Sequence, residues 1–118
     1  MGMSAKTIQR RQLLSVILNN RKVTSADVRE IRLEAGQETG RHLHPCAVLG
    51  YIVAGTARYQ IEGEAVQILP AGSAFYEPAE TVIESFGNAS DTEGVMFVAF
   101  YLKDGDQELI TMLSDDSD

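Results

Sequence analysis

The chain has 118 residues, of which 44% are hydrophobic and 23% are charged, the proportions of an ordinary soluble domain of single-domain size. Its formal net charge of −7 argues against nucleic acid or an anionic membrane as the main partner, because both are negatively charged. No apolar run approaches the ~20 residues of a membrane span, the start of the chain lacks the pattern of a secretory signal, and the single Cys46 cannot form an internal disulfide. We therefore expect a cytoplasmic protein.

The two ends of the chain differ in charge. Residues 1–41 carry eight Lys/Arg and four Asp/Glu, a net charge of +4, whereas residues 42–118 carry two and thirteen, a net charge of −11. We expect an N-terminal segment, residues 1–27, that packs on the acidic body of its own or a second subunit. The alternative is a solvated, mobile end. Its apolar residues permit either a short helix or a strand.

Alternation of apolar and polar residues predicts strands across most of the remaining chain. In residues 30–34, Ile31 and Leu33 share one face and charged residues occupy the other. Further short strands are expected at 49–54, 56–63, 64–69, 81–86 and 94–102, with turns at glycines between several of them, and residues 70–78 are expected to be a loop followed by a short strand. The last of these is apolar on both faces, so it is either central or covered by another subunit. The pattern predicts one all-β domain, a barrel or sandwich over residues 28–110, followed by an acidic tail, residues 111–118.

Both histidines lie in the stretch GRHLHP, residues 40–45. On a β-strand, His42 and His44 point to the same face and Leu43 to the other, with roughly 7 Å between their backbones. Imidazole is a common ligand for zinc, iron, copper and nickel. We therefore expect His42 and His44 to bind a divalent transition metal, whose identity the pattern does not reveal. The alternative is a pair of exposed or core histidines with no ligand.

The spacing of these residues resembles the cupins, a family of small β-barrels of the jelly-roll kind. Four residues fall at the spacings of the family's first motif: Gly36, His42, His44 and Gly55. Val48 occupies that motif's glutamate position. In the second motif two positions match and three differ: Gly72 and Pro78 match, and Glu80, Ile83 and Gly87 differ, with Asn88 one residue past the family's asparagine. The resemblance covers residues 28–102 and implies a single-domain cupin β-barrel.

The resemblance also implies a ligand set, because cupins usually hold their metal with three histidines and one glutamate. This chain keeps His42 and His44, but Val48 and Ile83, at the other two positions, have no donor atom. Two imidazoles plus water make a poor site, so we expect weak binding unless another residue completes it. Four residues are candidates for that role: Glu38, Cys46, Glu84 and Ser85. The simpler interpretation is that the carboxylates are surface charges and the thiol is buried as a small apolar group.

A small-molecule pocket is the other expectation. Val48 and Ile83 would line it with apolar surface, and Tyr51 and Tyr76 would flank it, where a phenol could orient a ligand or donate a proton. Both tyrosines could instead be packing residues. Three functions remain open: a weakly metal-binding cupin that acts on a small molecule, a metal-free small-molecule-binding or regulatory module, and a structural barrel without a ligand. Since cupins commonly pair, the resemblance also implies a homodimer.

Overall fold

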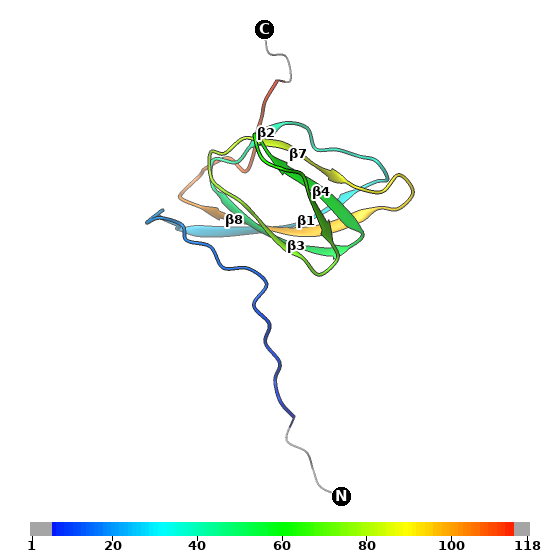
Figure 1. Ribbon diagram of the computed structural model, residues 1–118. Helices are drawn as coiled ribbons and strands as arrows, with labels where there is room; N and C mark the ends of the chain where they lie inside the picture. The colour runs from blue at the N-terminus through cyan, green and yellow to red at the C-terminus, as the bar shows by residue number, and fades with distance from the viewer. Residues whose placement is uncertain (1–5, 115–118) are drawn as a thin grey trace, which may run out of the picture.

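The structure is a computed structural model that describes residues 6–114, which form nine β-strands and no helix. In chain order the strands are β1 (Ser25–Leu33), β2 (His42–Leu43), β3 (Ala47–Ala54), β4 (Thr56–Ile61), β5 (Gln67–Pro70), β6 (Ala74–Glu77), β7 (Ile83–Asn88), β8 (Val95–Lys103) and β9 (Thr111–Met112). They form two antiparallel sheets, one in the order β1-β8-β3-β6 and one in the order β5-β4-β7-β2-β9 (Figure 1).

The sheets face each other as a sandwich. The described strands of one sheet do not pair with those of the other, so the sheets do not close into a barrel. The predicted all-β jelly-roll fold is confirmed, with two packed sheets in place of the closed barrel. The difference has a simple cause: a closed barrel needs hydrogen bonds between edge strands, and here β1, β6, β5 and β9 each keep one free edge.

The main core lies between the two sheets. Side chains alternate along each strand, so β8 sends Phe97 inward and the next residue outward. Phe75 from β6, Phe86 from β7 and Phe97 from β8 meet at the centre, with ring centroids 4.8 to 5.9 Å apart. Aromatic contacts of this kind join strands of both sheets.

The first strand begins before the expected domain of residues 28–110, and the last strand ends after it. β1 begins at Ser25, a little before residue 28, and residues 6–24 form an extended segment, here called the N-terminal arm, that leaves the sandwich (Figure 1). β9 pairs with β2, so the expected acidic tail begins with a strand of the five-stranded sheet. Residues 1–5 and 115–118 of the two predicted end segments lie outside the described residues. Because residues 6–114 contain no helix, they contain none that could cross a membrane.

Gly50 on β3 offers a test of the core packing. A β-carbon at this position would overlap the ring of Phe75, although the backbone there has no left-handed strain. We expect Gly50→Ala to lower the free energy of unfolding by about 1–3 kcal/mol, because the ring must move in a filled interior. Urea denaturation measures this difference. Gly94→Ala is the matched control, since its nearest contact would be the Leu33 carbonyl oxygen at an ordinary 3.4 Å. Equal stability of the two variants would contradict the packing.

Candidate metal centre

Three buried side chains meet between the sheets. His42 lies on β2, His44 follows that strand, and Glu77 ends β6, with 2%, 3% and 5% of their surfaces exposed. β2 belongs to the five-stranded sheet and β6 to the four-stranded sheet, so the cluster spans the sandwich. Glu77 points inward because β6 alternates, with Phe75 and Glu77 buried and Tyr76 turned outward.

One carboxylate oxygen lies between both imidazoles. The Oε1 atom of Glu77 is 3.2 Å from Nε2 of His42 and 3.1 Å from Nε2 of His44. The two rings meet edge to face, with their centroids 4.9 Å apart. Ligand atoms from all three residues lie within 4.8 Å of one another. The two imidazole nitrogens and the carboxylate therefore converge on a single small volume.

The hydrogen bond at Nδ1 of each imidazole determines which ring nitrogen carries the proton. Nδ1 of His42 donates to the Gly40 carbonyl at 2.7 Å, and Nδ1 of His44 donates to the Leu109 carbonyl at 2.6 Å. Because a carbonyl oxygen can only accept, each Nδ1 carries a proton, and a neutral ring then has a bare lone pair on Nε2. Two lone pairs facing one carboxylate oxygen repel it. A cation, either a metal ion or a proton on Nε2, removes that repulsion.

The donor types, and two of the three separations between donor atoms, match those of a divalent transition-metal site. With an ion about 2.1 Å from each ligand, neighbouring ligand atoms lie about 3.0–3.4 Å apart in octahedral or tetrahedral geometry. The two nitrogen–oxygen separations, 3.1 and 3.2 Å, fall in that interval. Two histidines with one carboxylate are the protein ligands of many non-haem iron sites and of some catalytic zinc sites, both of which keep positions open for water or substrate. The backbone acceptors on Nδ1 would hold both rings in place.

The pKa shifts of Glu77 and His44 favour an ion pair between these two residues. Burial raises the pKa of Glu77, but the hydrogen bonds and charges of His42 and His44 outweigh burial and hold that pKa below its ordinary range. Burial lowers the pKa of His44, but the hydrogen bond and charge of Glu77, with the Leu109 carbonyl, hold it above its ordinary range. The pocket thus favours a negative carboxylate surrounded by positive charge.

A cavity of about 70 Å³ adjoins the cluster. Besides the three cluster residues, it is lined by Ile31, Thr39, Phe86, Phe97, Ala99, Tyr101 and Ile110. The Tyr101 ring meets the His44 ring edge-on, with centroids 5.7 Å apart. Burial and the charge of Glu77 raise the pKa of Tyr101 to about 12, so its hydroxyl keeps its proton. The cavity has room for only a few water-sized groups, and its walls are mostly apolar.

The structure brings the two predicted metal-binding histidines together. It divides the four predicted pocket residues between the core and the outer face of the four-stranded sheet. Val48 and Ile83 are fully buried. Tyr51 is 38% exposed, and Tyr51 and Tyr76 both face outward on the four-stranded sheet, away from the interior. None of these four residues lines the 70 Å³ cavity.

Glu77 is the member of this cluster that the sequence analysis did not predict. In the β3–β6 ladder it pairs directly with Val48, the residue at the family's glutamate position. The carboxylate is thus supplied by the neighbouring strand. Ile83, which stands at the family's other missing ligand position, also lies beside the cluster, because it pairs with His42 in the β2–β7 ladder. A signal was available: alternation from Phe75, which is expected in the core, turns Glu77 inward one residue before Pro78.

The four residues that the sequence analysis considered as a third ligand lie outside the histidine–glutamate cluster. Glu38 forms an ion pair with Arg58, and Glu84 lies 3.6 Å from Arg41. Cys46 is fully buried in a small apolar cluster with Val48, Ala99 and Tyr101. The Ser85 hydroxyl is buried without a hydrogen-bond partner among the described residues. None of these four residues belongs to the histidine–glutamate cluster.

Residues 29–100 match the family model of the cupin domain. This chain belongs to the cupin family. Similar solved structures include a cupin-like protein from Thermotoga maritima, 23% identical with a TM-score of 0.66, which covers 75% of this chain and 64% of that one. A protein with a double-stranded β-helix domain from Klebsiella pneumoniae is 22% identical with a TM-score of 0.65, and 80% of each chain is covered.

A DMSP lyase from Ruegeria pomeroyi is 18% identical with a TM-score of 0.68, and the match covers 80% of this cupin and 46% of the lyase. At these identities the likeness shows the fold alone. This cupin spans less than two thirds of the Thermotoga protein and less than half of the lyase. A comparison with curated proteins found no match.

The cluster makes the stability of the metal-free protein depend on pH. Because the pKa of Glu77 is lowered from 4.5, its contribution is present above pH 4.5 and is lost as the pH falls through the lowered pKa. Because the pKa of His44 is raised from 6.5, its contribution is present below pH 6.5 and is lost as the pH rises through the raised pKa. We therefore expect the contribution of the cluster to the free energy of unfolding to be greatest between pH 4.5 and pH 6.5.

Urea unfolding of chelator-treated protein, followed from acid to alkaline pH, measures this profile. Glu77→Gln should flatten both limbs, because the ion pair is then absent. Glu84→Gln is the matched control, since Glu84 is an exposed carboxylate outside the cluster and its loss should keep the profile. Identical profiles for the wild type and Glu77→Gln would show that the cluster is not coupled to folding.

Proposed function

We propose that this cupin binds one divalent transition-metal ion through Nε2 of His42, Nε2 of His44 and the carboxylate of Glu77. The convergence of both Nε2 atoms on one carboxylate oxygen, while both Nδ1 atoms donate to backbone carbonyls, is the observation that carries the proposal. It supports a stronger site than two histidines alone would form. The identity of the metal is left to experiment.

The proposal extends to a small molecule as the partner of this site. A bound ion would polarise an oxygen atom of that molecule and stabilise negative charge on it. The chain's own residues would then do two things. The protonated Tyr101 hydroxyl would donate a hydrogen bond to the molecule, and the walls formed by Phe97, Ala99 and Ile110 would exclude water.

The size of the cavity limits that molecule to a few non-hydrogen atoms, or to the end of a larger one. We also propose a cytoplasmic location, because the single Cys46 is a buried free thiol, which a reducing compartment would keep reduced.

A metal-free binding or regulatory module is the second candidate. The raised pKa of His44 and the lowered pKa of Glu77 favour it, because protons on the imidazoles could neutralise the carboxylate without an ion. In that state the cluster and Tyr101 would bind a polar small molecule by hydrogen bonds. The two candidates differ in whether an ion stabilises the protein.

Isothermal titration of chelator-treated protein with Zn²⁺, Mn²⁺, Fe²⁺ and Ni²⁺ tests the proposal. We expect one equivalent of at least one of these ions to bind and to raise the melting temperature, because an ion that binds only the native state stabilises it by mass action. Glu77→Gln and His44→Ala should each weaken binding by roughly 100-fold or more, since removal of even an outer partner of a ligand costs about 10–100-fold.

Glu84→Gln, which removes an exposed carboxylate, should bind the ion as the wild type does. Binding that survives in Glu77→Gln would show that the ion lies elsewhere. If no ion binds, a thermal-shift screen with small polar metabolites decides the second candidate: stabilisation that His44→Ala abolishes would support the metal-free module.

A further inference from the structure

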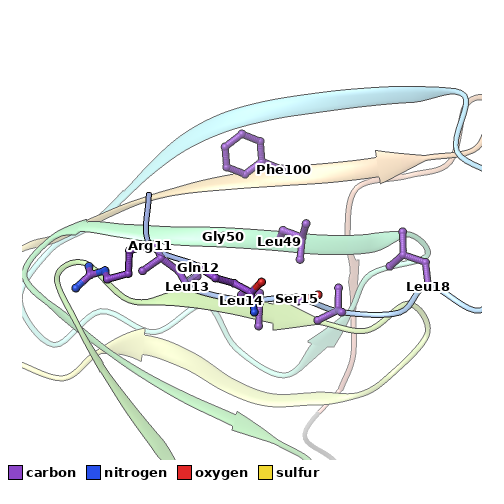
Figure 2. Close-up of a pocket in the computed structure, with 11 residues that line it drawn as sticks. Arg11, Gln12, Leu13, Leu14, Ser15, Leu18, Leu49, Gly50 and Phe100 are labelled. Carbon is purple, nitrogen blue, oxygen red and sulfur yellow. The ribbon is translucent and has the colours of Figure 1, made fainter. Parts of the chain in front are cut away.

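The segment that follows β8 covers the candidate metal centre. Residues 104–114, here called the C-terminal strap, turn back from the end of β8 and reach β2, where they form β9 (Figure 1). Ile110 of the strap lines the 70 Å³ cavity, and Leu109 packs on the small apolar cluster around Cys46. The N-terminal arm, by contrast, lies over the outer face of the four-stranded sheet (Figure 2). Of these two terminal segments, only the strap reaches the cavity.

The strap holds one of the proposed ligands directly. The carbonyl of Leu109 accepts the hydrogen bond from Nδ1 of His44 at 2.6 Å, so the strap determines which nitrogen of that ring carries the lone pair. Next along the strap, β9 pairs with β2, where Met112 lies opposite His42, the second imidazole ligand. Docking of the strap is therefore part of what directs both Nε2 atoms toward Glu77.

The strap is loosely held for a segment that covers buried ligands. Eight of its eleven residues are exposed, and none is fully buried. β9 has only two residues, of which Met112 is 56% exposed. Its single hydrogen bonds to the rest of the chain include that of the Leu113 amide to the Arg41 carbonyl, at 2.9 Å, and that of the Gly105 amide to the Thr24 hydroxyl, at 2.7 Å. Segments with few buried contacts and exposed hydrogen bonds open locally at a small cost in free energy.

The proposed ligands are otherwise closed off from solvent. All three expose 5% of their surfaces or less. Most residues that line the cavity lie on strands, and the exceptions are Thr39, His44 and Ile110. Thr39 is fixed, because its amide and its hydroxyl both donate to the Phe86 carbonyl, at 3.0 and 2.8 Å. Ile110 is 42% exposed and lies in the strap. The strap is therefore the wall of the cavity that opens most easily.

We propose that the C-terminal strap is a gate over the metal centre, which opens to admit the ion and the small molecule and docks more tightly once an ion is bound. This inference rests on the proposed metal site. An ion on Nε2 withdraws electron density from the His44 ring, so Nδ1 becomes a stronger donor to the Leu109 carbonyl. In the other direction, a docked strap keeps the proton on Nδ1 and leaves Nε2 free to bind. Because such coupling is reciprocal, the ion stabilises the docked strap by the same factor by which docking strengthens ion binding.

Hydrogen exchange of the Leu113 amide tests the gate, because that amide bonds to the Arg41 carbonyl only when the strap is docked. In the metal-free protein it should exchange by local opening, at a rate that low concentrations of urea do not change. Saturation with Zn²⁺, or with whichever of Mn²⁺, Fe²⁺ and Ni²⁺ binds instead, should slow this exchange by roughly 10-fold or more, as is typical of coupled sites. The Ser73 amide, which bonds to the Pro70 carbonyl in the β5–β6 turn, is the matched control and should exchange at an unchanged rate.

A variant of the strap tests the gate without altering any ligand of the ion. Leu113→Pro removes the amide that bonds to Arg41, so release of the bound ion to excess chelator should be roughly 5-fold faster or more, the factor that corresponds to one hydrogen bond. Leu113→Ala, which keeps the amide, should release the ion more slowly than Leu113→Pro. Glu108→Ala is the matched control: Glu108 is exposed on the strap, its side chain makes no hydrogen bond or ion pair with another described residue, and release should keep the wild-type rate. Circular dichroism shows whether each variant is folded.

These measurements separate the gate from the proposed metal site. If an ion binds but the exchange of the Leu113 amide is unchanged, or if Leu113→Pro releases the ion at the wild-type rate, the gate is overturned and the metal site stands. If no ion binds, the proposed function fails by itself, and the gate is decided in the metal-free protein. There His44→Ala should speed the exchange of the Leu113 amide by roughly 5-fold, because the bond to the Leu109 carbonyl is lost, and unchanged exchange would overturn the gate.

Discussion

The buried carboxylate of Glu77 is the constraint on which the arrangement of this cupin's interior depends. A charged carboxylate excluded from water costs several kcal/mol unless it is paired. Here its partners come from the opposite sheet, where His42 and His44 direct Nε2 toward it. Those rings are in turn fixed by backbone carbonyls, one of them in the segment that leads to β9. Three parts of the chain must therefore be in place before the charge is satisfied: the end of β6, the segment with both histidines, and the segment that leads to β9.

The location of this charge explains how the site differs from the pattern of its family. Val48 and Ile83 have no donor atom for an ion, and both pack as fully buried apolar residues. The register between β3 and β6 places Glu77 opposite Val48, so a carboxylate still reaches the same region from the neighbouring strand. Because neighbouring antiparallel strands lie about 5 Å apart, a glutamate side chain can span that displacement.

The four-stranded sheet has different surroundings on its two faces. Its inner face supplies Phe75 and Phe97 to the core and Glu77 to the histidine–glutamate cluster, and residues of the N-terminal arm lie against its outer face. The second sheet covers the inner face. The outer face mixes apolar side chains such as Phe100 with the exposed ion pair of Glu30 and Arg32.

The sequence by itself determined the fold class and the position of two histidines on one face of a strand. Alternation of residue types predicts the strands, and the spacing of His42 and His44 puts both rings on one face, because these patterns are local. The carboxylate was decided only by the tertiary structure. Glu77 is 33 residues from His44 along the chain, and nothing local shows that β6 lies across the interior from β2. Likewise, Tyr51 and Tyr76 face outward because of the phase of β3 and β6 relative to the core, which depends on the packing of the two sheets.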